Sequence, residues 1–142
     1  MTTTQMMAQD QIAANVQKWT LMLCDALKDN YREYAIRGYR YPYADNLAQL
    51  EYGRRKIEEL KNGYCPIDYV IETGKKYHKI IFVDSGGSRS VHAFVDKKTG
   101  EVYKSASWKS PAKGVRYDLR LIADREYLLE KADWSGGYLY AK

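Results

Sequence analysis

The chain has 142 residues, of which 45% are hydrophobic and 29% are charged, a composition that is ordinary for a globular protein with one core. No apolar run approaches the roughly 18 residues of a membrane span, and the first residues lack the basic and apolar regions of a signal peptide, so we expect no membrane partner. Cys24 and Cys65 have no metal-ligand spacing and are expected to be reduced thiols.

The net charge of +5 is unevenly distributed along the chain. Residues 64–123 carry eleven Lys and Arg against six Asp and Glu, whereas residues 1–63 carry nine against eight. Positive charge concentrated in this way favours an anionic partner such as nucleic acid. The 14 tyrosines suit an interface, and they equally suit a small core finished with amphipathic side chains.

An apolar face predicts a long first helix, from about residue 10 into residues 31–34, with Gly38 and Pro42 ending it. Side chains three or four residues apart lie on the same side of an α-helix. The residues of this face are Ile12, Val16, Trp19, Leu23 and Leu27.

A second helix is predicted from about residue 45 to Lys61, with Asn62 and Gly63 as its stop signal. Gly53 weakens the middle of this helix by about 1 kcal/mol relative to alanine. The apolar residues expected to face inward are Leu47, Leu50, Ile57 and Leu60.

After Pro66 the apolar period changes from that of a helix to the alternation of β-strands, and short glycine-containing links separate the runs. The runs are IDYVIE (67–72), YHKIIFV (77–83), SVHAFVD (90–96) and EVYKSAS (101–107). They predict an antiparallel meander of three or four strands with both helices on one face. Residues 123–133 predict a short helix, and residues 136–140 predict a final edge strand. The expected fold is therefore α+β in a single domain, 1–142, with a helical part at 1–63 and a mainly β part at 64–142.

The stretch KSASWKSPAKGVRYDLR, residues 104–120, sets five cationic side chains against one acid. Pro111 and Gly114 disfavour strand pairing, so residues 109–116 are expected to form an exposed loop at the sheet edge. One interpretation is a solvated loop with Trp108 covering the sheet edge. The other is a phosphate-holding loop beside aromatic rings, the combination that proteins use for single strands. The residues assigned to nucleic-acid binding are Lys104, Trp108, Lys109, Lys113, Arg116, Tyr117 and Arg120.

The segment YREYAIRGYRYPY, residues 31–43, holds five tyrosines and three arginines. Arginine stacks on aromatic rings and forks to carboxylates or phosphates, so the partner of such a segment could be a protein as readily as a nucleic acid. Its second half is expected in the connection between the two helices. The residues assigned to a protein interface are Arg37, Tyr39, Arg40, Tyr41 and Tyr43.

Two histidines, His78 and His92, are predicted on neighbouring strands, on the face that also carries Phe94. Two imidazoles are too few for zinc, which takes three or four protein ligands. We therefore expect a partly buried, hydrogen-bonded histidine pair, and no metal or other cofactor.

A nuclease is the third hypothesis. Asp84, Asp96 and Lys98 have the order of metal-dependent nucleases, in which two carboxylates hold Mg²⁺ and a lysine assists the attacking water. Glu58 or Glu59 could supply another acid. Residues 96–100 equally suit a hairpin turn, which needs Asp and Gly for backbone reasons alone, so enzymatic activity is not expected.

Two segments resemble small, uncharacterised proteins encoded by tailed bacteriophages. They are VHAFVDKKTGEVYKSASWKSPAKGVRYDL (Val91–Leu119) and ADWSGGYLY (Ala132–Tyr140), which together make up little more than a quarter of the chain. The resemblance implies an origin and no particular activity. It is compatible with a nucleic-acid-handling protein in the host cytoplasm during infection, or with a component of the virion.

The leading hypothesis is accordingly a non-enzymatic phage protein that binds nucleic acid, single strands included, through the basic and aromatic loop. The alternative is a virion structural protein or a protein–protein interaction component. Its partners would then be phage or host proteins, or further copies of the chain.

Overall fold

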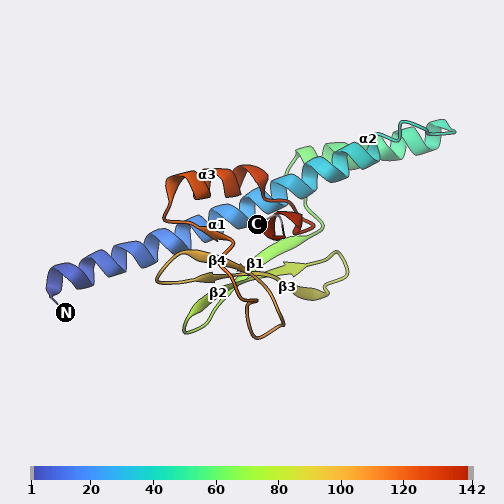
Figure 1. The fold of residues 1–142 in the computed structure, drawn as a ribbon. Helices are drawn as coiled ribbons and strands as arrows, with labels where there is room; N and C mark the ends of the chain where they lie inside the picture. The colour runs from blue at the N-terminus through green and yellow to red at the C-terminus, as the bar shows by residue number, and fades with distance from the viewer. Residues whose placement is uncertain (1, 141–142) are drawn as a thin grey trace.

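The computed structural model describes residues 2–140 and has the predicted α+β fold (Figure 1). The sheet has five strands where three or four were predicted, and a 3₁₀ turn replaces the predicted edge strand at residues 136–140. The elements are α1 (Thr3–Tyr39), α2 (Leu47–Lys61), β1 (Asp68–Thr73), β2 (Tyr77–Val83), β3 (Arg89–Asp96), β4 (Glu101–Lys104), β5 (Tyr117–Asp118), α3 (Ile122–Lys131) and η1 (Gly137–Leu139).

Helix α1 is longer than predicted at both ends. At its start, the Thr2 hydroxyl accepts a hydrogen bond from the Gln5 backbone N–H at 3.1 Å, and the Gln5 side chain accepts one from the Thr2 N–H at 2.8 Å. This capping box satisfies two N–H groups that a helix start leaves without partners. At the other end the helix runs through Gly38, because one glycine costs a helix only about 1 kcal/mol. Within residues 2–140, no helix is both long and apolar enough to cross a membrane.

The strands form an antiparallel meander in the order β1-β2-β3-β4-β5, and one side of this sheet, here called the helix face, packs against α1 (Figure 1). Val16, Leu23 and Leu27 of α1 are fully buried there, and the predicted apolar side of this helix is confirmed. Burying one such side chain contributes about 1.5–3 kcal/mol. The sheet residues in the same core are Tyr69, Ile80, Ala93, Val95, Val102 and Tyr117.

The C-terminal segment completes this core. Leu128 of α3 and Leu139 of η1 are buried in it, and the Arg125 guanidinium lies over the Trp19 ring of α1 at 4.2 Å. The Tyr69 hydroxyl donates to the Trp134 carbonyl at 2.9 Å, so the strand at one edge of the sheet holds the chain that follows α3. Helices α1 and α3 therefore cover the helix face together.

A β-bulge on β3 changes which way His92 points. Ile80 pairs with Ala93, but Ile81 pairs with Val91, so His92 is the extra residue of β3. Two consecutive residues at a bulge can share one face of a sheet. His92 consequently contacts Tyr69 and Tyr138 on the helix face, while Phe94 lies on the opposite side beside Tyr77.

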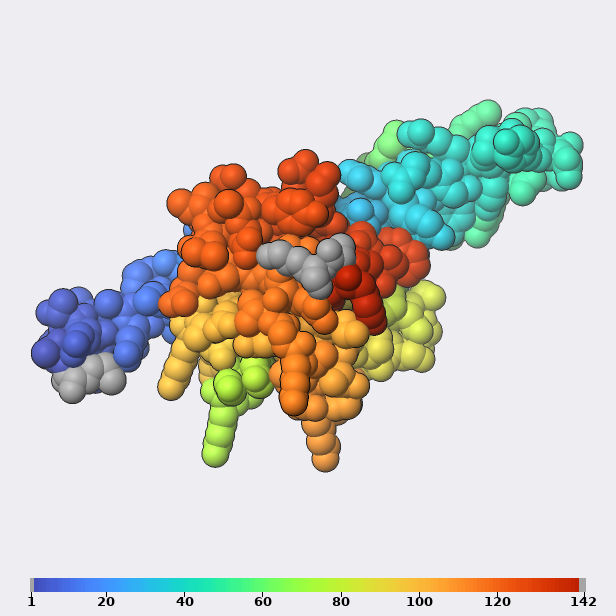
Figure 2. All heavy atoms as spheres, viewed as in Figure 1, coloured from blue at the N-terminus to red at the C-terminus, as the bar shows by residue number. Residues whose placement is uncertain are grey.

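Helix α2 packs against the C-terminal part of α1 and extends beyond the sheet; residues 35–63 are here called the arm (Figures 1 and 2). The prediction that both N-terminal helices cover the sheet is wrong in this respect. Leu47 and Leu50 were expected to face inward, but their side chains are 63% and 38% exposed. Of the α2 residues, Gly53 and Leu60 are buried. The physical reason is that α2 has one helix to pack against and no sheet.

Candidate nucleic-acid interface

Aromatic side chains gather on the side of the sheet turned away from α1, here called the open face. Residues that pair across neighbouring strands share a face, so Lys79, Phe94 and Tyr103 lie together. Tyr77 joins them because it is two residues from Lys79 on the same strand. The Tyr77 ring centroid lies 5.6 Å from that of Phe94 and 6.1 Å from that of Tyr103. Edge-to-face contacts of this kind hold the rings in fixed positions.

The segment between β4 and β5, residues 105–116, is an ordered excursion tied to the end of β4. Ser105 and Pro111 form an isolated β-bridge, and the Ala112 N–H donates to the Lys104 carbonyl at 2.7 Å. At its tip, the Ser107 hydroxyl accepts from the backbone N–H groups of Lys109 and Ser110. Serine hydroxyls commonly stabilise tight turns in this way. The loop therefore presents its tip in one conformation.

This loop carries Trp108 to the open face. The Lys79 ammonium lies 4.7 Å from the Trp108 ring centroid, and the Trp108 side chain is 43% exposed. Lys79 also lies 5.9 Å from the Phe94 ring. One ammonium group thus connects the tip of the loop to the aromatic residues of the sheet, and each contact is worth about 0.5–1 kcal/mol at an exposed site.

A cavity of about 210 Å³ lies beside these rings. Its lining brings Lys109 of the loop together with Lys75 and Lys76 of the β1–β2 turn, and with Glu72, which is itself paired with Arg89 at 3.7 Å. Figure 2 shows long side chains projecting from this end of the sheet in the segments near residues 75 and 110. The eight residues here called the basic–aromatic face are Lys75, Lys76, Tyr77, Lys79, Phe94, Tyr103, Trp108 and Lys109. Phe94 is 2% exposed, so it supports its neighbours and offers no free ring of its own.

Two of the residues assigned to nucleic-acid binding from the sequence are corrected by their positions. Tyr117 is 2% exposed, and its hydroxyl donates to the Tyr138 carbonyl at 2.8 Å, so it offers no free ring. Lys104 pairs with Ala93 and therefore lies on the helix face, where its ammonium is 4.2 Å from the Tyr140 ring. The sequence argument missed both because composition alone does not show on which face of the sheet a side chain lies, or whether it is buried.

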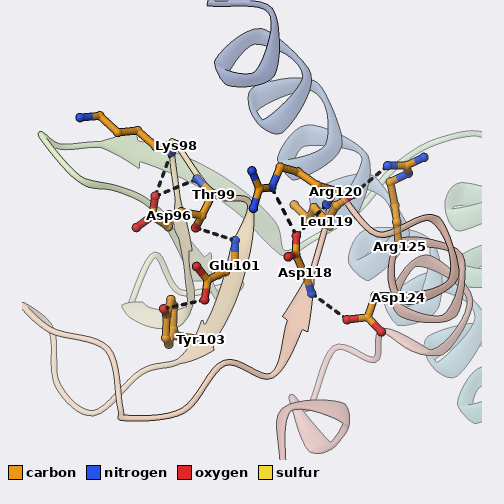
Figure 3. Close-up of polar contacts among 10 residues, drawn as sticks. All are labelled: Asp96, Lys98, Thr99, Glu101, Tyr103, Asp118, Leu119, Arg120, Asp124 and Arg125. Carbon is orange, nitrogen blue, oxygen red and sulfur yellow. Dashed lines mark hydrogen bonds and ion pairs between the residues drawn. The ribbon is translucent and has the colours of Figure 1, made fainter. Parts of the chain in front are cut away.

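The remaining assigned cations lie apart from Trp108. Arg120 is beyond β5, where it approaches the Asp118 carboxylate at 3.8 Å (Figure 3). Lys113 is exposed in the second half of the loop, and Arg116 is half-buried just before β5. The structure therefore brings together Trp108 and Lys109 of the predicted set and separates the others from them.

The structure adds six residues that the sequence argument did not assign to binding, namely Lys75, Lys76, Tyr77, Lys79, Phe94 and Tyr103. Alternation along YHK and EVYK does place an aromatic or a lysine on the open face of each strand. This alternation shows which residues share a face across strands only when the strand register is known. The bulge at His92 changes that register.

The residues assigned to a protein interface lie at the tip of the arm. Tyr43 is 93% exposed, and Tyr39 packs against Tyr41 and Tyr52 with ring centroids about 6 Å apart. A groove of about 460 Å³ follows the end of α1 and includes Arg37 in its lining. The predicted interface residues are thus accessible. They belong to a different part of the chain, residues 37–43, from the basic–aromatic face at residues 75–109.

The expected histidine pair does not form. The His78 ring hydrogen-bonds to the Thr73 hydroxyl at 2.8 Å, while the His92 ring hydrogen-bonds to the Tyr138 hydroxyl at 2.8 Å. Burial lowers the pKa of both imidazoles, to about 4 for His92. The rings do not meet because His78 pairs with Val95, three residues or about 10 Å along β3 from His92.

The carboxylates of the nuclease pattern are too far apart to share a metal ion. Asp96 pairs with Tyr77 at one end of β2, whereas Asp84 follows the other end, seven residues or about 23 Å away. Each caps a turn: Asp84 accepts from two backbone N–H groups, and Asp96 accepts from those of Lys98 and Thr99 (Figure 3). The turn interpretation accounts for both residues.

The remaining groups that could take part in chemistry are metal ligands and the two thiols. Among residues 2–140, no three His, Cys, Asp or Glu side chains come together in a way that could hold a metal ion. Cys24 and Cys65 are free thiols, and burial raises the pKa of Cys24 to about 12, which keeps it protonated at neutral pH. Thiolate, not thiol, is the nucleophilic form.

Comparison with known proteins gives a family without an assigned activity. A family model described as "Family of unknown function (DUF7717)" matches residues 2–141, so the chain belongs to this family. No curated protein and no solved structure matches the chain.

Proposed function

We propose that this DUF7717 protein binds single-stranded nucleic acid through the basic–aromatic face. The observation that carries the proposal is the placement of Lys79 between the rings of Trp108 and Phe94, next to a cavity lined by further lysines. Rings on an open sheet face and lysines at its border are what a single strand requires.

The two kinds of side chain have different tasks in this proposal. The exposed Trp108 ring stacks on an unpaired base, a contact that is worth about 1–3 kcal/mol. Lys76, Lys79 and Lys109 contact successive phosphates. Double-stranded nucleic acid keeps its bases stacked on each other, so a protruding ring gains nothing from a duplex.

Fluorescence anisotropy with a labelled single-stranded oligonucleotide, measured over a range of salt concentrations, tests the proposal. Each phosphate contact contributes about 0.7 to the slope of log affinity against log salt for single strands, so replacing Lys76, Lys79 and Lys109 by Gln should lower that slope by about 2. Trp108→Ala should weaken binding roughly 5- to 100-fold at every salt concentration.

Matched variants outside the basic–aromatic face control for charge and for loss of a ring. Lys18, Arg54 and Lys61 are exposed on α1 and α2, so replacing all three by Gln removes the same charge from elsewhere. Tyr64→Ala removes an aromatic ring that is 56% exposed. The proposal is contradicted if the triple variant of the basic–aromatic face and the triple variant on the helices weaken binding equally. It is also contradicted if Trp108→Ala leaves binding unchanged.

A second candidate function is protein binding at the tip of the arm. It is favoured by the groove of about 460 Å³ beside Arg37 and by the exposed Tyr43 ring, both of which lie away from the sheet. Tyr and Arg are enriched at protein interfaces. Light scattering over a wide concentration range checks whether the partner is a second copy of the chain, in which case Arg37→Ala with Tyr43→Ala should give a monomer.

We also propose a tailed-phage origin for the protein, on the basis of the resemblance in residues 91–119 and 132–140. The protein would then act in the cytoplasm of the infected host or reside in the virion. Mass spectrometry of purified phage particles and of infected-cell extracts distinguishes these locations. Absence from both in a culture that carries the gene contradicts the proposed origin.

A further inference from the structure

A second cavity, of about 360 Å³, lies on the helix face. One side of it is formed by β3 and the end of β4, and the other by the chain that follows α3. Its volume falls within the range of small-molecule sites. Of the described residues that line it, Lys104 is the one with a charged side chain. Phe82 and Leu139 supply apolar surface, and His92 and Gly136 lie next to each other in the lining.

The hydrogen bond to Tyr138 is the basis for assigning which nitrogen of His92 carries the proton. Burial raises the pKa of the Tyr138 hydroxyl well above its usual range, so this hydroxyl stays protonated. We assign the proton of this bond to the hydroxyl, which then donates to His92 Nε2 at 2.8 Å and leaves the neutral imidazole with its own proton on Nδ1. The bulge on β3 points this ring toward the cavity instead of the open face.

Gly136 lies beside the edge of the ring that carries Nδ1. Gly136 has φ +85°, and a side chain built there would meet His92 Cε1 at 3.6 Å and Nδ1 at 3.9 Å. The Cε1–Nδ1 edge of the ring therefore lies close to Gly136, and both residues belong to the lining of the cavity. The ring thus presents one hydrogen-bond donor to whatever enters the cavity.

The acid closest to this site is already satisfied by donors. The Asp133 carboxylate accepts hydrogen bonds from the Ser135 hydroxyl and from the backbone N–H groups of Gly137 and Tyr138. Burial raises the pKa of Asp133, but these hydrogen bonds lower it by more, so the net shift is downward. Asp133 therefore holds the turn at residues 133–138, and Lys104 provides the charge inside the cavity.

We propose that this cavity binds the phosphate group of a small phosphomonoester, with the Lys104 ammonium and the His92 Nδ1–H group as donors. Phe82 and Leu139 lie against the organic part of the ligand. A phosphate offers several acceptor oxygens, which suits one charged and one neutral donor without a neighbouring acid in the lining. The site is on the face opposite Trp108, so it is independent of the proposed nucleic-acid interface.

NMR of the full chain tests the proposal with two probes, inorganic phosphate and adenosine monophosphate. Titration up to about 10 mM detects dissociation constants in the millimolar range. We expect shifts at the His92 ring and the Gly136 amide, and a rise in the pKa of His92 of at least one unit, because a bound anion stabilises the imidazolium. Stronger binding of the nucleotide indicates that the organic part contributes, and equal binding indicates that the phosphate alone does; both support the site.

Two variants make the result specific. Lys104→Met removes the ammonium that lies over Tyr140 and should weaken binding of both probes at least tenfold, whereas Lys61→Gln, on the arm, should leave it unchanged. An amide spectrum like that of the wild type shows that each variant is folded. The proposal is overturned if neither probe shifts the His92 ring, or if Lys104→Met binds as well as the wild type. Neither result bears on oligonucleotide binding, which Trp108 and Lys79 test separately.

Discussion

Helices α1 and α2 both carry leucines at helical spacing, but the part of α1 that crosses the sheet and the arm are stabilised very differently. Where α1 crosses the sheet, Leu23 and Leu27 are fully buried, but in α2 Leu47 is 63% exposed and Leu50 is 38% exposed. A helix gains most of its stability from packing an apolar face and little from propensity. The comparison teaches that α1 belongs to the core because it has a sheet to cover, while α2 has only α1.

The largest expected effect separates buried from exposed leucines on one helix. Leu23→Ala removes a fully buried side chain and should lower the free energy of unfolding by about 2–5 kcal/mol. Leu21→Ala, two residues away and 52% exposed, should change it by less than about 0.5 kcal/mol. Urea unfolding followed by circular dichroism measures both. Equal losses would show that α1 does not pack on the sheet as described.

A second variant should loosen the arm and leave the sheet intact. A Cβ at position 53 would collide with the Tyr39 carbonyl oxygen and with the Tyr41 ring, so Gly53→Ala should cost about 1–3 kcal/mol. Gly38→Ala, which meets nothing within 4 Å inside α1, should instead stabilise by about 0.5–1 kcal/mol. Hydrogen exchange locates the change: faster exchange is expected in residues 47–61 and not in β2 or β3. Acceleration throughout the chain would mean that the arm and the sheet unfold together.

A smaller effect concerns the pH dependence of the sheet region. Burial lowers the pKa of His92 to about 4, and the unfolded chain takes up the same proton near its usual value of 6.5. The unfolded state therefore binds more protons between these values, and stability should fall as pH is lowered from 6.5 toward 4, by at most about 1.4 kcal/mol per pH unit from this group. Thermal unfolding of His92→Gln, which keeps an acceptor for Tyr138, should show a shallower fall. His78, whose pKa is also lowered, accounts for part of the slope that remains.

The sequence predicts those parts of the molecule that depend on local periodicity. The apolar side of α1 and the four longer strands follow from spacing alone, and both turn carboxylates follow from turn chemistry. The bulge at His92 carries no local signal, because alternation continues unchanged through SVHAFVD. The exposure of Leu47 could not be predicted either, since the sequence of a helix does not say what it packs against.

In the candidate interface, too, some residues could be predicted from local sequence and others depend on the tertiary structure. Trp108 and Lys109 were predicted from composition, because positive charge and an aromatic ring coincide in one short stretch. Lys79 and Tyr77 join them only through strand register and the folded loop, which bring together residues about 30 positions apart. Proximity across a sheet is a property of the tertiary structure, so the composition of a single segment could identify the loop residues of the site and not the residues on the strands.

The smallest effect tests whether charge helps to attach α1 to the sheet. The Lys28 ammonium lies 3.2 Å from the Asp68 carboxylate at the start of β1, and the two side chains are 29% and 50% exposed. Partly exposed pairs of this kind contribute about 0.2–1 kcal/mol. A double-mutant cycle with Lys28→Gln and Asp68→Asn should give a coupling energy in that range, and it should decrease in high salt. Because one buried leucine of α1 contributes more than this pair, a coupling energy above about 2 kcal/mol would mean that electrostatics, and not apolar burial, distinguishes the sheet-packed part of α1 from the arm.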